Sequence, residues 1–418
     1  MWALALLLRG RSFTFTTNLY IQYTFKERKG GEENSGPRAI LSHIAEFMVS
    51  SSTIQTTLVR HQQTIDTALR TLFQETVSSA QLPALAAYYG QMQYHLGWLD
   101  ADLKPTQSNP GKLLRPTLVL LAYEAAGAWG SANELSPDST YLHRALPAAV
   151  AVELTHNFTL IHDDIEDGDI ERRHRPTLWT IWGVPQSINS GDGMYALSRL
   201  ALWKVLEHRV SGDIAARLAT ILDRTVLVVA EGQYLDISFE ERQDISVSMY
   251  IDMISRKTAA LMGCAVEMGA LLGTQDEETI RLLRTFGDAI GVAFQVRDDI
   301  LGIWATEAEL GKTSAGDVYR RKKSLPILHA LEHASPEDQR RLQAIYGQKS
   351  ALTPEQVAEV MTIFEHTGTQ AYCHQFLRHH CQLAHEALSR VPHHTSPLSR
   401  RALNDMEILI QFTEDIAS

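Results

Sequence analysis

The chain has 418 residues, a net charge of −11 and a pI near 5.9, and 44% of its residues are hydrophobic. This acidic balance argues against a nucleic-acid-binding protein, which would present a basic face, but it leaves room for local basic patches that bind anionic ligands. The three cysteines, Cys264, Cys373 and Cys381, are too few and too scattered for a disulfide framework, and they favour a reducing, cytoplasmic setting.

The apolar run WALALLL near the N-terminus is at the short end for a signal peptide, and a weak targeting segment is the minor alternative for this region. No apolar run approaches the roughly 20 residues that a transmembrane helix needs, so we expect no stable membrane insertion. The opening MWALALLLRGRSFTF lacks a leading basic residue and a clear cleavage site, and TFKERKGGEENSGP resembles a linker. We expect residues 1–50 to be a disordered extension or a start assigned too early, with Met48 as the alternative start.

From about residue 55 onwards, apolar residues recur at three- and four-residue intervals, which is typical of amphipathic helices. The pattern continues through RALPAAVAVELTHNFTLIH and MYIDMISRKTAALMGCAVEMGALLG to SRRALNDMEILIQFTEDI near the C-terminus. Gly, Pro, Ser, Asp and Asn separate the segments. Strand patterns are nearly absent, and several central segments are apolar all round, as inside a large bundle. The sequence predicts an all-α, single-domain helical bundle over residues 51–418.

Two acidic clusters each follow an apolar helical segment. Asp163, Asp164 and Asp167 end the first one, and Asp298 and Asp299 end the second. Residues 163 and 167 share a helix face, so their charges repel unless a cation neutralises them. A solvated helix end is the alternative explanation. Carboxylates beside a buried helix, without Cys or clustered His, favour Mg²⁺.

Basic residues surround these clusters in the sequence. Arginine binds phosphate oxygens bidentately and lysine supplies a compact charge, although each of these residues alone is ordinary surface charge. Two acidic helices that face each other would bracket a diphosphate through shared metal ions, as facing helices do in other bundles. The candidate phosphate-binding residues are Lys112, Arg115, Arg172, Arg173, Arg175, Lys257, Lys312 and Lys322.

Together these motifs resemble the trans-polyprenyl diphosphate synthases, a family with the isoprenoid synthase fold. PGKLLRP at 110–116 resembles the family's GGKxxRP element. LTHNFTLIHDDIED at 154–167, followed by RRHRPT at 172–177, resembles the first Asp-rich motif and its arginine pair. KT at 257–258, FQVRDD at 294–299 and GDVYRRKKSLP at 316–326 follow in the family's order. The resemblance covers about residues 60–415 and, within the family, is greatest to short-chain geranylgeranyl diphosphate synthases.

The resemblance implies a role for each matching residue. Two Mg²⁺ ions belong to Asp163 and Asp167 with support from Asp164, and a third belongs to Asp298 with support from Asp299. The residues implied for the allylic diphosphate are Arg172, Lys257, Gln295 and Lys312, with Thr258 and Lys322 as further substrate-binding residues. Those implied for isopentenyl diphosphate are Lys112, Arg115, His156 and Arg173. Gln233 and Asp236 of GQYLD are expected to border the diphosphate pocket.

The implied chemistry is a prenyl transfer. Mg²⁺ and the basic side chains neutralise the leaving diphosphate, so the allylic C–O bond ionises. The allylic cation then alkylates the double bond of isopentenyl diphosphate, and a proton is lost. Catalysis is expected to depend on Asp163, Asp164, Asp167, Asp298 and Lys257, around a central cavity that receives the growing chain.

The sequence departs from the family pattern at two positions. Gly302 stands where the second Asp-rich motif has its last Asp, which leaves open an altered rate, a specialised product, or a substitute carboxylate such as Glu307 or Glu309. Pro110 replaces the first glycine of GGKxxRP, while Lys112 and Arg115 keep their spacing.

Product length is expected to depend on Phe158 and Thr159, which precede Asp163 by five and four residues. Helical side chains point back toward the helix N-terminus, so these two would point down a product tunnel. One aromatic residue there resembles the geranylgeranyl diphosphate synthases and implies a C20 product. A C15 or longer product, and an ordinary core position for Phe158, are the alternatives.

Two other functions share this fold. A class I terpene cyclase would not need the set Lys112, Arg115 and His156, because it binds no isopentenyl diphosphate. A non-catalytic partner subunit would tend to lack the first acidic cluster, which is complete here. The resemblance further implies a homodimer.

Overall fold

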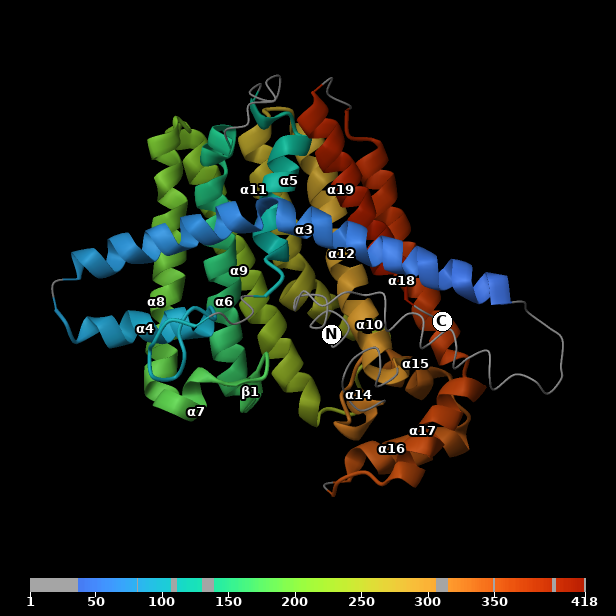
Figure 1. Ribbon diagram of the computed structural model, residues 1–418. Helices are drawn as coiled ribbons and strands as arrows, with labels where there is room; N and C mark the ends of the chain where they lie inside the picture. Colours follow the sequence, from blue (N-terminus) through green and yellow to red (C-terminus); the bar gives the residue numbers. More distant parts are fainter. Residues whose placement is uncertain are drawn as a thin grey trace. The chain divides into compact units, whose positions relative to one another are not determined.

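The computed structural model describes residues 37–80, 82–106, 111–129, 139–305, 315–348, 350–392 and 396–416. These residues are mostly helical, which confirms the predicted all-α fold (Figure 1). In chain order, the helical elements of the N-terminal half are α3 (Pro37–Ser79), α4 (Leu85–His95), α5 (Leu114–Ala125), η2 (Ser139–Arg144), α6 (Leu146–Glu166), α7 (Leu178–Trp182), α8 (Val184–Trp203), η3 (Lys204–His208) and α9 (Gly212–Glu241). They are followed by α10 (Val247–Ile254), the π-helix η4 (Ser255–Ala259), α11 (Ala260–Gly273), α12 (Glu277–Trp304), α14 (Gly316–Tyr319), α15 (Leu325–His333), α16 (Pro336–Gly347), α17 (Pro354–His366), α18 (Thr369–Ser389) and α19 (Pro397–Glu414).

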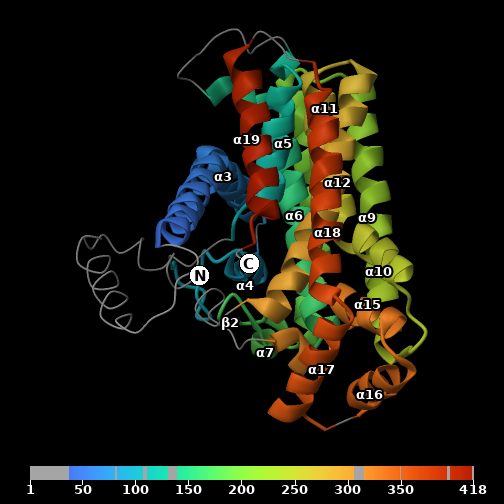
Figure 2. The ribbon, with the colours of Figure 1, turned by 90° about the vertical axis from the view of Figure 1, so that its right-hand side faces the viewer.

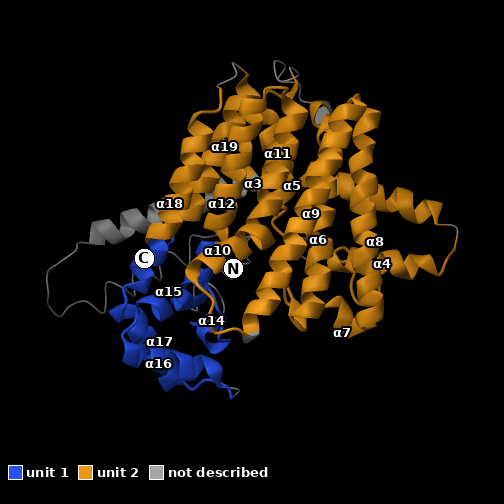
Figure 3. Cartoon of the chain, turned by 180° about the vertical axis from the view of Figure 1, so that it is seen from behind, with its two compact units in different colours: residues 1–52, 296–374, 415–418 blue, residues 53–295, 375–414 orange. Residues whose placement is uncertain are grey.

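The chain divides into two compact units, and each is described by itself (Figure 3). Unit 1 comprises residues 1–52, 296–374 and 415–418, and unit 2 comprises residues 53–295 and 375–414. The single catalytic domain expected over 51–418 stays a prediction. Residues 37–50 belong to α3, and the N-terminal extension expected over 1–50 also stays a prediction.

The core of unit 2 is built from α5, α6, α8, α9, α11 and α19, which run side by side (Figures 1 and 2). Every residue of α11 except Glu267 is buried, as predicted for a segment that is apolar all round. Gly269 allows α11 to pack closely against α5, because a Cβ at this position would lie 2.1 Å from the carbonyl oxygen of Val119. Helix α6 packs along α8, and the first acidic cluster lies at the C-terminal end of α6.

Unit 1 contains the C-terminal end of α12, the short helix α14, and α15–α17, where α17 packs against α14, α15 and α16. Trp304, the last residue of α12, has its ring centroid 5.9 Å from that of Phe364 on α17. This contact holds the end of α12, where the second acidic cluster lies, within unit 1. No helix in the described parts of the chain is both long and apolar enough to cross a bilayer.

Candidate active site

The first acidic cluster is held by basic side chains rather than by its own members. Asp164 is 2% exposed and accepts a hydrogen bond from Arg172 Nε. Asp163 Oδ1 lies 3.3 Å from Lys257 Nζ, which also donates a 2.6 Å hydrogen bond to Asp236 Oδ2. The structure therefore brings together four residues that the sequence assigned to the site, and it adds Asp236 as the second partner of the lysine.

Asp167 closes α6 without such a partner in the contacts described, and its surroundings are acidic. Desolvation by the surrounding protein, and then the charge of Asp163, raise the pKa of Asp167 to about 6. Burial likewise raises the pKa of Asp164 to about 6, against the attraction of Arg172. Within the described residues, no three His, Cys, Asp or Glu side chains converge on one metal position. A set of carboxylate oxygens with excess negative charge is nevertheless what a hard divalent cation requires.

A short β-hairpin after α6, with two residues in each strand, orients Arg172 and Arg173. Strand β1 (Glu171–Arg172) pairs antiparallel with β2 (Arg175–Pro176). The turn residues, Arg173 and His174, have φ values of 54° and 61°, the left-handed conformation of a type I′ turn, which non-glycine residues adopt at a cost. This turn sends Arg172 back to Asp164, while Arg173 extends toward the PGKLLRP segment.

That segment meets Arg173 at a glycine. Gly111 has a φ of 96°, and a Cβ built there would lie 2.9 Å from Arg173 Nη2. Four residues further, Arg115 Nη1 lies 3.2 Å from His156 Nε2 on α6. Burial, and then Arg115 and Arg173, lower the pKa of His156 well below its usual value, so the imidazole is neutral. The basic pocket, defined here as Gly111, Arg115, His156 and Arg173, joins three motifs that are far apart in sequence.

A buried acid in the same region was not identified from the sequence. Glu153 is 3% exposed, and Asn157 Nδ2 donates hydrogen bonds to its Oε1 at 2.7 Å and to its carbonyl oxygen at 2.8 Å. Burial raises the pKa of Glu153 to about 7, although Asn157, Arg115 and Arg173 favour its ionised form. Because the segment AAVAVELTH has the pattern of an apolar helix, the single carboxylate within it did not stand out as a candidate site residue.

Arg175, another candidate phosphate-binding residue, makes several contacts with α4 and the segment after it. Its guanidinium stacks 3.9 Å from the ring centroid of Tyr94 and donates to the carbonyl oxygens of Tyr94 and Leu99 at 2.9 and 2.6 Å. These contacts join the hairpin to α4. A small cavity remains beside it, lined by His95, Asp164, Arg172 and Arg173 among others.

Lys257 lies in the π-helix η4, a departure from α-helical geometry that frequently marks a functional site. The turn packs directly on α9, because a Cβ at Gly232 would lie 2.3 Å from the backbone nitrogen of Lys257. The next residue, Thr258, donates a 3.1 Å hydrogen bond to Gln295 Oε1. The KT pair and the glutamine before the second acidic cluster thus come together as the sequence motifs implied.

The second acidic cluster belongs to unit 1. Asp299 is fully buried, and its Oδ1 lies 3.3 Å from Lys322 Nζ, while Asp298 is exposed. Lys322 Nζ is also 3.7 Å from Asp317 Oδ2. Lys322 is therefore brought to the second cluster, whereas Lys312, Glu307, Glu309 and Pro110 lie outside the described residues, and Lys112 is exposed.

The residues expected to limit product length lie where α6 meets α8. The Phe158 ring centroid is 5.0 Å from that of Tyr195 and 5.9 Å from that of His162. All three side chains are only partly buried. Thr159 donates a 2.7 Å hydrogen bond to the carbonyl oxygen of His156, so its hydroxyl is satisfied on its own helix. Tyr195 is an aromatic neighbour that the sequence pattern did not indicate.

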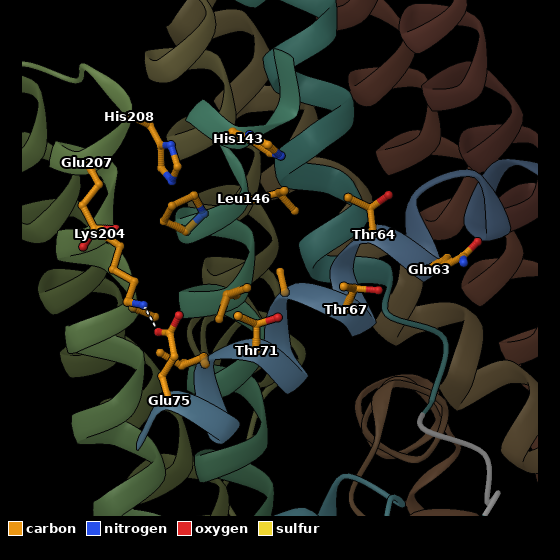
Figure 4. A pocket seen from close by; sticks show the side chains of 15 residues that line it. Gln63, Thr64, Thr67, Thr71, Glu75, His143, Leu146, Lys204, Glu207 and His208 are labelled. Carbon is orange, nitrogen blue, oxygen red and sulfur yellow. Dashed lines mark hydrogen bonds and ion pairs between the residues drawn. The ribbon is translucent and has the colours of Figure 1, made fainter. Parts of the chain in front are cut away.

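A cavity of about 600 Å³ lies at the other end of α6 (Figure 4). It is lined by α3, by the start of α6 with Leu146, Pro147 and Val150, and by the end of α8 and η3. Figure 4 shows the Lys204–Glu75 ion pair at one side of this cavity. Eleven residues separate Pro147 from Phe158, which corresponds to about 16 Å along a helix and nearly the same face.

Comparison with known proteins identifies the family. Residues 97–364 match the family model of the polyprenyl synthetases. The (2E,6E)-farnesyl diphosphate synthase of Mycobacterium tuberculosis is 36% identical over 302 residues, which cover 72% of this chain and 79% of that protein. The geranylgeranyl diphosphate synthase of the same strain is 37% identical over 275 residues, covering 66% and 74%.

Solved structures agree with the sequence relatives. The crystal structure of a polyprenyl synthetase from Streptomyces coelicolor A3(2) superimposes with a TM-score of 0.73 at 32% sequence identity. The match covers 86% of this chain and 99% of that one. The chain therefore belongs to the polyprenyl synthetase family, has the isoprenoid synthase fold and is a prenyltransferase.

Proposed function

We propose that the enzyme condenses isopentenyl diphosphate with an allylic diphosphate and that its main product is the C20 geranylgeranyl diphosphate. The observation that carries this proposal is the basic pocket of Gly111, Arg115, His156 and Arg173 beside the acidic end of α6. A terpene cyclase needs one diphosphate site. This chain has a second group of basic side chains next to the first, which supports a two-substrate reaction.

The two groups have different chemistry, which supports different substrates. In the basic pocket, the neutral His156 donates or accepts a hydrogen bond without adding charge, while Arg115 and Arg173 bind diphosphate oxygens. At the acidic end of α6, Lys257 approaches carboxylates. We assign isopentenyl diphosphate to the basic pocket and the allylic diphosphate to the group around Lys257, Arg172 and Gln295.

The carboxylates of Asp163 and Asp167 are the proposed Mg²⁺ ligands of unit 2, and Asp298 is the exposed candidate in unit 1. The donor set fits, because these oxygens are hard ligands and the charges of Asp163 and Asp236 lie close to the partly buried carboxylate of Asp167. Asp164 and Asp299 support the clusters through Arg172 and Lys322 instead. When bound, up to three Mg²⁺ ions would stabilise the charge that develops on the leaving diphosphate.

A C20 product is supported by the rings of Phe158 and Tyr195, since Phe158 lies on α6 between its acidic end and the cavity at its start. A chain that reaches these rings meets a steric stop. The relatives named above include both farnesyl and geranylgeranyl synthases, so the C15 product is the alternative that the assay must separate from C20.

We also propose a homodimer and a cytoplasmic location. Leu227, Tyr234 and Ile237 are 61%, 72% and 42% exposed on α9, at spacings that place them on one helix face. Exposed apolar stripes of this kind mark protein interfaces. Buried thiols at Cys264, Cys373 and Cys381 suit a reducing compartment.

Initial-rate kinetics with both substrates test the assignment. In Arg115→Gln, we expect the KM for isopentenyl diphosphate to rise about 10- to 100-fold while the KM for the allylic substrate changes little, because a charged hydrogen bond is lost at one site only. Arg281→Gln is the matched control, since Arg281 forms an exposed ion pair with Glu278. An equal rise in both KM values for Arg115→Gln would refute the assignment.

A further inference from the structure

The departure at Gly302 has a structural counterpart within unit 1. Gly302 lies in the last turn of α12, four residues after Asp298. A Cβ built at Gly302 would lie 2.4 Å from Asp317 Oδ2 and 2.6 Å from Asp317 Cγ. These separations are well inside van der Waals contact, so the carboxyl group of Asp317 occupies the space that a side chain at residue 302 would take.

Asp317 is not an ordinary surface acid. It lies in α14 and is 5% exposed. Its Oδ1 accepts a 2.6 Å hydrogen bond from Arg320 Nη2, and its carbonyl oxygen accepts one from the backbone nitrogen of Lys322 at 2.9 Å. The carboxylate is thus fixed at the end of α12 by the basic segment that follows it.

Lys322 connects this carboxylate to the second acidic cluster. Its Nζ lies 3.3 Å from Asp299 Oδ1 and 3.7 Å from Asp317 Oδ2. Asp299 is fully buried, and a buried carboxylate needs a partner of opposite charge. Lys322 therefore balances two nearly inaccessible carboxylates that come from different segments of unit 1.

We propose that Asp317 supplies the carboxylate that the second acidic motif lacks at residue 302. The absence of a side chain at Gly302 leaves room for the carboxyl group of Asp317. Asp317 acts as a positioning residue that holds Lys322 beside Asp299. A carboxylate from α14 therefore occupies the space beside residue 302, where a side chain on α12 would otherwise lie. The effect on catalysis rests on the proposed prenyl transfer, with Lys322 as one of the further substrate-binding residues that the family resemblance implies.

A double-mutant cycle tests this exchange, with Gly302→Asp, Asp317→Ala and the combined variant. Gly302→Asp alone forces two carboxylates into one space, and Asp317→Ala alone releases one side of Lys322. We expect each single change to lower kcat/KM for the allylic diphosphate about 10-fold or more, and the pair to recover most of it, since coupled residues are strongly non-additive. Gly316→Ala is the control, because nothing lies within 4 Å of a Cβ at Gly316.

A positioning role also predicts how the loss divides. Asp317→Asn, which keeps the shape but removes the charge, should raise the allylic KM more than it lowers kcat. The proposal is overturned if Gly302→Asp is as active as wild type, or if the double variant shows the product of the two single losses. Failure of wild type to elongate any primer would count against the proposed function instead, and thermal unfolding of the same four proteins would still test the exchange of space.

Discussion

The ammonium group of Lys257 lies 3.3 Å from the carboxylate of Asp163, so a residue expected to bind substrate is the counter-ion of the first acidic motif. Burial opposes the charge on the lysine, but Asp163 and Asp236 raise its pKa. Lys257 therefore remains protonated at neutral pH. If Mg²⁺ bound the carboxylates as proposed, the ammonium group would be available to a diphosphate.

This arrangement predicts the phenotype of Lys257→Ala. We expect kcat/KM for the allylic diphosphate to fall about 100-fold, because one preorganised charge is lost where the leaving group develops its own. The KM for isopentenyl diphosphate should change little. Steady-state kinetics provide the measurement, with the exposed Lys104→Ala as control; a loss of the same size in that control would show a general charge effect.

Phe158→Ala should lengthen the product. We expect removal of the ring to open space beside Tyr195, so that the growing chain would extend along α6 toward its start, where the 600 Å³ cavity lies. Mass spectrometry of dephosphorylated products should show a shift from C20 to C25 and longer chains. Phe158→Tyr, which keeps the ring, is the control. An unchanged spectrum for Phe158→Ala would remove this residue from the account of chain length.

Gly111→Ala should weaken binding of isopentenyl diphosphate. The new methyl group would meet Arg173 Nη2 at 2.9 Å, on a backbone with a φ of 96°. We expect the KM for this substrate to rise about 10-fold, as for the loss of one hydrogen bond to a charged group. Gly368→Ala separates strain from contact, because Gly368 has a φ of 63° and open space around it. The control should lose about 1 kcal/mol of stability with unchanged KM values. If both variants shift KM equally, the contact with Arg173 is not responsible.

Glu153→Gln should make the protein more stable at alkaline pH. Burial raises the pKa of Glu153 to about 7. Between the usual glutamate pKa and this value, the folded state holds a proton that the unfolded state has released, so stability falls as pH rises. Glutamine removes this dependence and still accepts the hydrogen bond from Asn157. We expect the variant to gain about 3 kcal/mol over wild type at pH 8 and almost nothing at pH 4.5. Thermal unfolding curves that differ by the same amount at both pH values would contradict this.

Leu227→Glu combined with Ile237→Glu should produce monomers. Two charges on the exposed α9 stripe place desolvation costs at the proposed interface. Light scattering after size exclusion measures the mass. Leu82→Glu, at a residue that is 65% exposed outside the stripe, should leave the dimer intact. A wild-type protein that is already monomeric would disprove the proposed interface.

The sequence was sufficient for the helical fold, because helical periodicity is encoded locally, while the roles of the site residues stay predictions. Apolar periodicity located the helices, and the position of Asp163 after an apolar run indicated a site at a helix end. The pairs Arg115–His156 and Thr258–Gln295 were implied only by resemblance, and the structure places their side chains within 3.2 Å and 3.1 Å of each other.

Other features depend on contacts that no local pattern carries. The type I′ turn at Arg173 and His174 lacks the glycine or asparagine that would signal it. Glu153 lies alone in an apolar segment, and its role depends on Arg115 and Arg173 from two other segments. In the sequence, Gly302 was interpreted as the loss of the last Asp of the second motif. Asp317, whose carboxyl group lies beside Gly302, could not be connected with it because it belongs to a separate helix.

The most direct test of the central claim is product analysis with defined primers. Purified enzyme, Mg²⁺ and labelled isopentenyl diphosphate are incubated separately with C5, C10 and C15 allylic diphosphates, and the dephosphorylated products are sized. We predict elongation of all three primers to a common C20 product, and no product when the metal is chelated. No elongation of any primer, or cyclised hydrocarbons without incorporation of label, would contradict it.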